Sequence, residues 1–282
     1  MNKRGGLVLA GCAFGVMLLA GCATPQRTAD HGSPGRGASY VAMGSSFAAG
    51  PGITQTADTP PTRCARSRDN YAHQLARKRG FRLTDVSCSG AKALHLLEKW
   101  AELPPQLDAL TPDTALITVT VGGNDVGYIG GLIGASCRAV GGSSCLPVMD
   151  PGEQDWQELE ARMRAMLAEM RRRAPHARII VIDYPAVLPD GGQCQATPLP
   201  PQQADRSRAI AARLARLTAE VARQSGVELL QASRFTHGHD ACAADPWMNG
   251  FNASADWTSF VPYHPNLAGM TAVANALDHM ID

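Results

Sequence analysis

The stretch YVAMGSSFAAGPG, residues 40–52, begins as a short apolar run and changes at Gly44 into two serines and a loop of small residues. Glycine and serine are common in turns, so the hydroxyls of Ser45 and Ser46 are compatible with a simple turn. The other interpretation is a nucleophile at the carboxyl end of a buried strand, where open α/β sheets place their functional sites. The patterns in the rest of the chain distinguish the two.

The segments after this stretch alternate between strand-like and helix-like patterns. ALITVTV at 115–121 and RIIVIDY at 178–184 are apolar, β-branched runs of the kind that form buried strands. This alternation is typical of a parallel sheet with helices on both faces, so we predict a three-layer α/β/α sandwich. Further strands are expected at 39–43, 82–87 and 227–230, and helices at 70–79, 92–103, 156–173, 202–224 and 265–280.

The composition shows no break between residues 39 and 282, so we predict one catalytic domain over 39–282. Within it, a glycine-rich stretch at 127–150 fits a loop that borders a functional site. The formal net charge of +1 gives no indication of a nucleic-acid partner. We expect the domain to be a monomer.

The first 21 residues are typical of an export signal rather than of a folded domain. Lys3 and Arg4 precede an apolar stretch over 7–20 that is too short for a membrane span. The stretch ends in LLAGC at 18–22, which resembles the lipobox of bacterial lipoproteins, cleaved just before its cysteine.

The lipobox resemblance implies that Cys22 becomes the first residue of the mature protein and carries acyl groups such as palmitate. Ala23 follows, which implies the outer membrane as destination if the organism is Gram-negative. An ordinary secretory signal with a chance cysteine is the alternative. Residues 22–38 are rich in Pro, Gly, Ser and Thr and show no apolar periodicity, so we predict a flexible tether between the anchor and the domain.

Six cysteines remain in the mature domain. An even number in an exported protein indicates disulfides, and six cysteines allow fifteen connectivities. A zinc site is the competing use, because His237, His239 and Asp240 lie close to Cys242, but no CxxC pair accompanies them. We therefore expect no metal and no other cofactor. The six are Cys64, Cys88, Cys137, Cys145, Cys194 and Cys242.

Chemically useful groups follow three of the predicted strands. Ser46 follows the first strand, Gly90 the second and Asn124 the third. Because the carboxyl ends of parallel strands lie along one edge of a sheet, these groups can converge. His264, in the VPYHPN segment before the last helix, is the candidate base.

These four positions, in this order, resemble the SGNH (GDSL) hydrolase family. The motifs are GSS at Ser46, CSGA at Gly90, GGND at Asn124 and YHPN at His264. The match runs from Tyr40 to the last helix and implies a flavodoxin-like α/β/α fold. The cysteine intervals resemble the secreted actinobacterial-type lipase branch, which implies the sequential pairs Cys64–Cys88, Cys137–Cys145 and Cys194–Cys242.

The resemblance implies a serine esterase or lipase that hydrolyses carboxylic esters through an acyl-enzyme. Ser46 would attack the ester, and His264 would accept its proton and return it to the leaving alcohol. The negative oxygen of the tetrahedral intermediate would face the backbone N–H groups of Ser46 and Gly90 and the side-chain amide of Asn124.

Two positions depart from the family pattern. Ser45 stands where the family usually has Asp, which puts the support of this loop in question and makes Ser45 a rival nucleophile. Val261 stands where many members have an Asp three residues before the His. We therefore expect a Ser46–His264 dyad in which the Val261 carbonyl orients the imidazole, with Asp256 as a weaker candidate.

Other functions use the same features. A deacylase or acyltransferase acting on cell-envelope glycans or lipids would share the site. A catalytically silent envelope lipoprotein with a binding or structural role would explain the departures at Ser45 and Val261. The S-x-x-K sequence at Ser89 lacks the companion motifs of penicillin-binding proteins, and no G-x-S-x-G elbow is present.

Overall fold

The computed structural model describes residues 1–2 and 32–282. Residues 3–21 of the predicted signal peptide, Cys22 and the first part of the tether lie outside the described residues. Among the helices of the described residues, none combines the length and apolar character needed to cross a bilayer.

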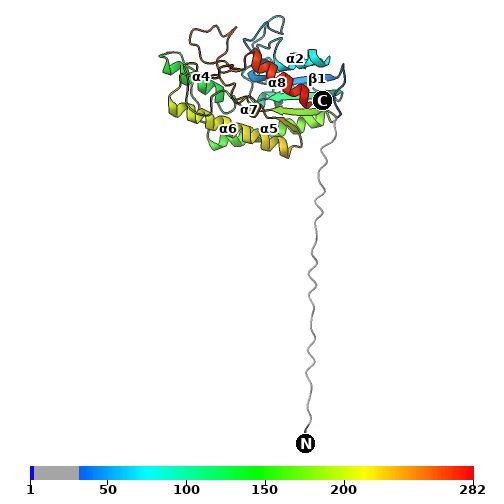
Figure 1. Ribbon diagram of the computed structural model, residues 1–282. Helices are drawn as coiled ribbons and strands as arrows, with labels where there is room; N and C mark the ends of the chain where they lie inside the picture. The colour runs from blue at the N-terminus through cyan, green and yellow to red at the C-terminus, as the bar shows by residue number, and fades with distance from the viewer. Residues whose placement is uncertain (3–31) are drawn as a thin grey trace. The chain divides into compact units, whose positions relative to one another are not determined.

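A five-stranded sheet in the order β2-β1-β3-β4-β5 forms the central layer (Figure 1). Every pair of neighbouring strands is parallel. The prediction of a parallel α/β sandwich is therefore confirmed. The strands are β1 (Ser39–Gly44), β2 (Arg82–Asp85), β3 (Thr114–Thr120), β4 (Arg178–Ile182) and β5 (Glu228–Leu230).

Helices cover both faces of the sheet, with α2 and α8 on one side and α5 and α6 on the other (Figure 1). The helices are α1 (Ser46–Ala49), α2 (Tyr71–Arg79), α3 (Leu94–Leu97), α4 (Tyr128–Ala139), α5 (Glu153–Arg173), α6 (Pro201–Gln224), α7 (Ala232–Phe235) and α8 (Leu267–Met280), and η1 (Gln106–Ala109) is a 3₁₀ turn.

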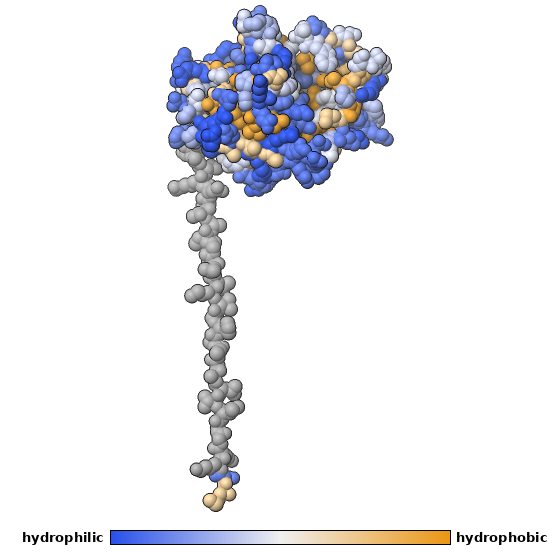
Figure 2. Space-filling view, turned by 180° about the vertical axis from the view of Figure 1, so that it is seen from behind, coloured by the Kyte–Doolittle hydropathy of each residue, from blue (hydrophilic) through white to orange (hydrophobic). Residues whose placement is uncertain are grey.

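The strand pattern explains why there are two apolar cores. Successive residues of a strand point to opposite faces. On β1, Val41 and Met43 pack with α4, α5 and α6, whereas Tyr40 and Ala42 pack with α2 and α8. Both faces of the strand must therefore be apolar. Figure 2 shows the outer surface from behind, where hydrophilic residues predominate and hydrophobic ones gather in small patches.

Two segments differ from the prediction. The glycine-rich range 127–150 begins with a helix, α4, because its apolar residues pack in the core. One of its glycines serves close packing, since a Cβ at Gly134 would overlap the carbonyl of Leu146. In contrast, only Leu94–Leu97 of the expected helix 92–103 is helical. Trp100 instead pairs with Leu103 in a β-bridge and stacks on His95, with ring centroids 4.2 Å apart.

The six cysteines form three disulfides with sequential pairing, which confirms the connectivity that the family resemblance implied. Cys64–Cys88 attaches the loop after α1 to the segment after β2, and Cys137–Cys145 links the last turn of α4 to the chain that follows it. Cys194–Cys242 joins the loops before α6 and after α7. The bridge at Cys88 lies two residues from Gly90 and so bears directly on the site.

Candidate active site

Ser46 and His264 meet at the carboxyl edge of the sheet. Ser46 begins α1 directly after β1, and its Oγ lies 2.8 Å from Nε2 of His264. Both side chains are largely buried, with 8% and 6% exposed. The hydroxyl of Ser45 is fully buried and points instead to the hydroxyl of Tyr184, at 3.1 Å. The geometry therefore favours Ser46 over Ser45 as the nucleophile.

The loop that carries Ser46 is held from two sides. Gly44 has a φ of +127°, and a Cβ there would overlap the backbone of Thr120, so the sharp turn out of β1 requires glycine. The Gln106 side chain accepts from the Gly44 N–H at 2.8 Å and donates to its carbonyl at 3.0 Å. The Ser45 N–H donates to the carbonyl of Thr120 at 2.9 Å.

The imidazole is oriented by a backbone carbonyl, but not the predicted one. Nδ1 of His264 lies 2.8 Å from the carbonyl oxygen of Pro262. The carbonyl of Val261 accepts instead from the Asn249 side chain at 3.0 Å. The prediction for Val261 is wrong because Tyr263 has a φ of +58°, which reverses the chain and directs the following residue back toward Pro262.

This contact determines which nitrogen of His264 can act as a base. A carbonyl only accepts hydrogen bonds, so Nδ1 carries the hydrogen and Nε2 is left to accept from the Ser46 hydroxyl. The other candidate for orienting the ring, Asp256, is exposed, and its carboxylate bonds to the N–H and hydroxyl of Thr258. The ring thus faces a dipole rather than a charged partner.

Burial changes the titration of the candidate base. Desolvation lowers the pKa of His264 to about 4, and the hydrogen bond to the Pro262 carbonyl opposes this shift only in part. The imidazole is therefore neutral at neutral pH. A neutral ring is the form that can accept the proton of a serine hydroxyl.

Tyr263 shapes the histidine loop, although no sequence motif singled it out. Its left-handed backbone is costly for a residue with a side chain and persists where the surroundings hold it. The side chain is fully buried, and its hydroxyl lies 2.5 Å from the Ser136 hydroxyl in α4. Its N–H donates to the carbonyl of Asn249 at 3.2 Å. Helix α4 thus takes part in placing His264.

The three groups expected to bind an oxyanion are on neighbouring loops. Within residues 32–282, neither the N–H of Ser46 nor that of Gly90 donates to another protein group. Gly90 has a φ of +84°, which suits glycine. The amide nitrogen of Asn124 donates to the carbonyl of Ala91 at 2.9 Å. This nitrogen has a second hydrogen, so Asn124 both ties the Gly90 loop in place and keeps a free donor.

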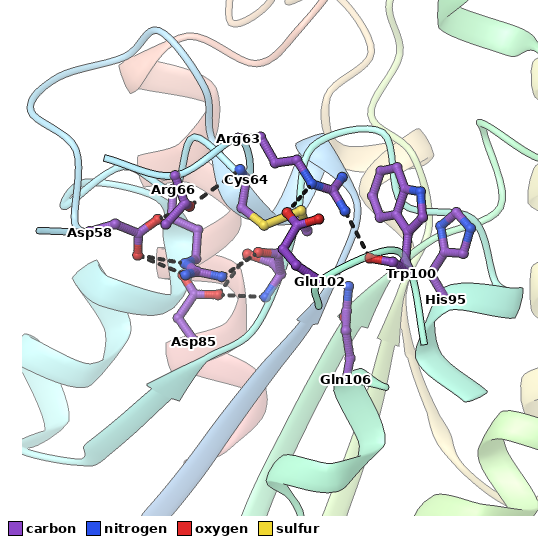
Figure 3. Close-up of a disulfide and its surroundings, with 12 residues drawn as sticks. Asp58, Arg63, Cys64, Arg66, Asp85, His95, Trp100, Glu102 and Gln106 are labelled. Atoms are coloured by element: carbon purple, nitrogen blue, oxygen red, sulfur yellow. Dashed lines mark hydrogen bonds and ion pairs between the residues drawn. A yellow bond between two sulfur atoms is a disulfide. The ribbon is translucent and has the colours of Figure 1, made fainter. Parts of the chain in front are cut away.

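The loop of Gly90 also rests on the Cys64–Cys88 disulfide (Figure 3). The N–H of Ser89 donates to the carbonyl of Cys64 at 3.1 Å. Beside the bridge, Arg63 lies 3.8 Å over the ring of Trp100. Trp100 and the disulfide line a cavity of about 380 Å³ next to this loop.

The predicted alternative of a zinc site is not formed. Cys242 is bonded to Cys194, and His239 stacks on Trp247 with ring centroids 3.6 Å apart. Over the described part of the chain, no group of three or more His, Cys, Asp or Glu side chains is arranged to hold a metal ion.

Comparison with known proteins gives a family profile and several relatives that this chain resembles. The profile of the GDSL-like Lipase/Acylhydrolase family matches residues 42–272. Lipase 2 of Streptomyces coelicolor is 35% identical over 255 residues, which cover 86% of this chain and 84% of that protein. The extracellular lipase of Streptomyces rimosus has a crystal structure with a TM-score of 0.67 and 25% identity, covering 86% of this chain and 99% of the other. Phospholipase A1 of Streptomyces albidoflavus NA297 shares the fold, with a TM-score of 0.69, 24% identity and the same coverage of 86% and 99%.

Proposed function

Because the chain belongs to the GDSL-like lipase/acylhydrolase family, it is a carboxylic ester hydrolase, and we propose that Ser46 and His264 are its catalytic dyad. The observation that carries the proposal is the 2.8 Å distance between Ser46 Oγ and His264 Nε2, with Nδ1 held by the Pro262 carbonyl. Nucleophile, base and orienting group therefore form one hydrogen-bonded chain, as activation of a serine requires.

The reaction proceeds in two halves. Ser46 Oγ attacks the ester carbonyl carbon while its proton passes to Nε2 of His264. The imidazolium returns this proton to the alkoxy oxygen, the carbon–oxygen bond breaks, and the alcohol leaves. Water then attacks the acyl carbon while its proton passes to the neutral imidazole. The imidazolium returns this proton to Ser46 Oγ as the bond between Oγ and the acyl carbon breaks, and the acid leaves.

The developing negative oxygen is placed between the N–H groups of Ser46 and Gly90 and the second amide hydrogen of Asn124. This assignment is supported by the N–H groups of Ser46 and Gly90, neither of which donates to another acceptor within residues 32–282. One such donor contributes about 10²–10³ in rate. The three donors come from the ends of β1, β2 and β3, so their spacing depends on the sheet.

We further propose lipid esters as substrates and the cell envelope as location. The names of the relatives, lipase and phospholipase A1, support the substrate class. The LLAGC sequence at 18–22 supports a lipid anchor at Cys22 after export. An enzyme tethered to a membrane by its first residue is held close to lipid esters.

Labelling with a fluorophosphonate tests the nucleophile. We expect the probe to modify Ser46, as mapped by mass spectrometry, because it reacts with serines activated by a base. Ser46→Ala should abolish labelling and lower kcat by about 10⁴-fold or more. Ser89→Ala is the matched control and should keep the label. A label on Ser45 or Ser89, or an active Ser46→Ala enzyme, would contradict the proposal.

A further inference from the structure

Tyr184 lies two residues after β4, between the loops of the proposed nucleophile and the proposed amide donor. Its hydroxyl oxygen lies 3.1 Å from the Ser45 hydroxyl and 2.9 Å from the backbone nitrogen of Gly123. Ser45 and Gly123 immediately precede Ser46 and Asn124. One phenol group thus connects the two loops at the residues next to the reacting groups.

The direction of the two hydrogen bonds follows from their chemistry. The N–H of Gly123 can only donate, so the Tyr184 oxygen accepts from it. The single hydroxyl hydrogen is then available for Ser45 Oγ. Burial raises the pKa of Tyr184 to about 12, so the phenol keeps this hydrogen at neutral pH.

The surroundings hold the ring in this position. A Cβ on Gly123 would lie 2.7 Å from Cζ of Tyr184, so glycine is needed for the ring to approach the backbone. The ring of Phe47 packs 4.6 Å from that of Tyr184 and 5.1 Å from that of His264. Tyr184 therefore contacts the nucleophile loop, the amide loop and the residue that packs on the base.

We infer that Tyr184 is a positioning residue whose hydroxyl sets the spacing between Ser46 and the oxyanion donor Asn124. The inference rests on the proposed function, because it assigns no reaction step to Tyr184 itself. It also accounts for Ser45 in place of the family's usual Asp: the loop next to the nucleophile is supported by a neutral hydroxyl pair instead of a carboxylate.

The test compares Tyr184→Phe with Tyr128→Phe in the full-length protein, using p-nitrophenyl butyrate. We expect Tyr184→Phe to lower kcat about 10- to 100-fold, the cost of misplacing catalytic groups by a fraction of an ångström to an ångström. KM should change by less than about twofold, because the substitution leaves unchanged the interactions that bind the substrate and the transition state equally. Tyr128 is also buried, 6.1 Å from Tyr184 between ring centroids, and within residues 32–282 its hydroxyl forms no hydrogen bond. Tyr128→Phe should therefore retain wild-type kcat.

A second readout separates positioning from stability. Butylboronic acid forms a tetrahedral adduct with an active serine and mimics the transition state. We expect its inhibition constant to rise in Tyr184→Phe by the same factor by which kcat/KM falls. Ser45→Ala should lower kcat in the wild type and have no further effect in Tyr184→Phe, because its contribution passes through the phenol.

A Tyr184→Phe enzyme with wild-type kcat and boronate affinity would overturn the inference. If Tyr184→Phe does not fold, the Ser45→Ala variant tests the inference in its place, because a wild-type kcat in Ser45→Ala would also overturn the inference. Failure of the proposed function is distinguishable, because it would appear as activity in Ser46→Ala. An inactive Ser46→Ala beside a fully active Tyr184→Phe rejects the positioning role alone.

Discussion

The imidazole of His264 is buried and faces the carbonyl of Pro262 rather than a carboxylate. A carboxylate would stabilise the imidazolium with a full charge, whereas a carbonyl offers only a dipole. Burial therefore prevails, and the pKa of His264 falls to about 4. A base of this kind is weaker than an Asp-paired histidine but remains available far into the acid range.

We expect the acid limb of kcat/KM to lie near pH 4, the pKa of His264, rather than near the ordinary value of 6.5. The base must be neutral, so activity is present above this pKa and is lost as the pH falls through it. The measurement is kcat/KM for a short-chain ester from pH 3 to 8, with product determined after quenching.

The same shift has a consequence for stability. Because the folded-state pKa is lowered, the unfolded chain binds more protons between pH 6.5 and about 4. The free energy of unfolding therefore falls as the pH is lowered through this window. Tryptophan fluorescence at each pH separates unfolding from loss of the base.

For the pH dependence of activity, an acid limb of kcat/KM near pH 6.5 in folded protein would show that the His264 ring titrates like an exposed histidine.

At the residue scale, the sequence predicts where a functional residue lies in the fold better than it predicts which atoms that residue contacts. The motifs around Ser46 and His264 place one just after a strand and the other just before a helix, and in the structure their side chains lie 2.8 Å apart. The family pattern leads to the carbonyl of Val261, which stands at the usual Asp position. The contact with Pro262 is not predictable, because the positive φ of Tyr263 has no sequence signal. In the sequence Tyr184 is only the end of an apolar run, because its hydrogen-bond partners follow two other strands, β1 and β3.

At the scale of elements, the Cys64–Cys88 bridge, drawn in Figure 3, lies two residues before Gly90 in the chain. On one side, the carbonyl of Cys64 accepts from the Ser89 N–H. On the other, the N–H of Cys88 donates to the Gly44 carbonyl at 2.9 Å. The bridge thus joins the loop of Gly90 to the one that carries the nucleophile.

We expect the double variant Cys64→Ser/Cys88→Ser to lose about 2–4 kcal/mol of unfolding free energy. It should also lose kcat at 25 °C by roughly 10-fold, because the Gly90 N–H is no longer fixed. Thermal unfolding and ester hydrolysis by the folded enzyme measure the two effects.

Cys194→Ser/Cys242→Ser is the matched control. This bridge joins the loops before α6 and after α7, with a sequence separation of 48, and neither cysteine is adjacent in the chain to a residue of the proposed site. It should lower stability and leave kcat within about twofold of the wild type, as for changes away from the site. Equal kcat in both double variants would show that the bridge at Cys88 stabilises the fold without placing Gly90.

The type of an element is predictable where apolar periodicity is strong, and the prediction fails where glycine or tryptophan dominates the sequence. The range 127–150 contains enough glycine to suggest a loop, yet α4 forms because its apolar residues pack in the core, and Gly134 lets the backbone of Leu146 approach. The helix expected at 92–103 stops after Leu97, because Trp100 stacks on His95. Neither tertiary contact is visible in local sequence.

At the scale of the whole molecule, the layer order follows from the alternation of patterns alone. Segments such as 115–117 and 179–182 are apolar at consecutive positions, which requires cover on both faces of the strand. The order β2-β1-β3-β4-β5 has no local sequence signal, because strand neighbours depend on long-range packing. This order nonetheless brings the ends of β1, β2 and β3 together at the site.

The proposed anchor is a property of the entire chain. We expect Cys22→Ala to move the protein from the membrane fraction to the soluble fraction and to abolish incorporation of radiolabelled palmitate, because the acyl acceptor is lost. Cys12→Ala, within the predicted signal, is the control and should leave both unchanged. Retention of Cys22→Ala in the membrane fraction would contradict the lipid anchor.

The sequential disulfides have a consequence for how the chain matures. Each cysteine of the domain pairs with the next one along the chain, so no bridge encloses another cysteine. A polypeptide emerges amino end first from a ribosome or through a translocation pore. Both cysteines of one pair therefore emerge before those of the following pair. Oxidation in order of appearance then yields the native set, and the protein can reach its final form with an oxidase but without a shuffling isomerase.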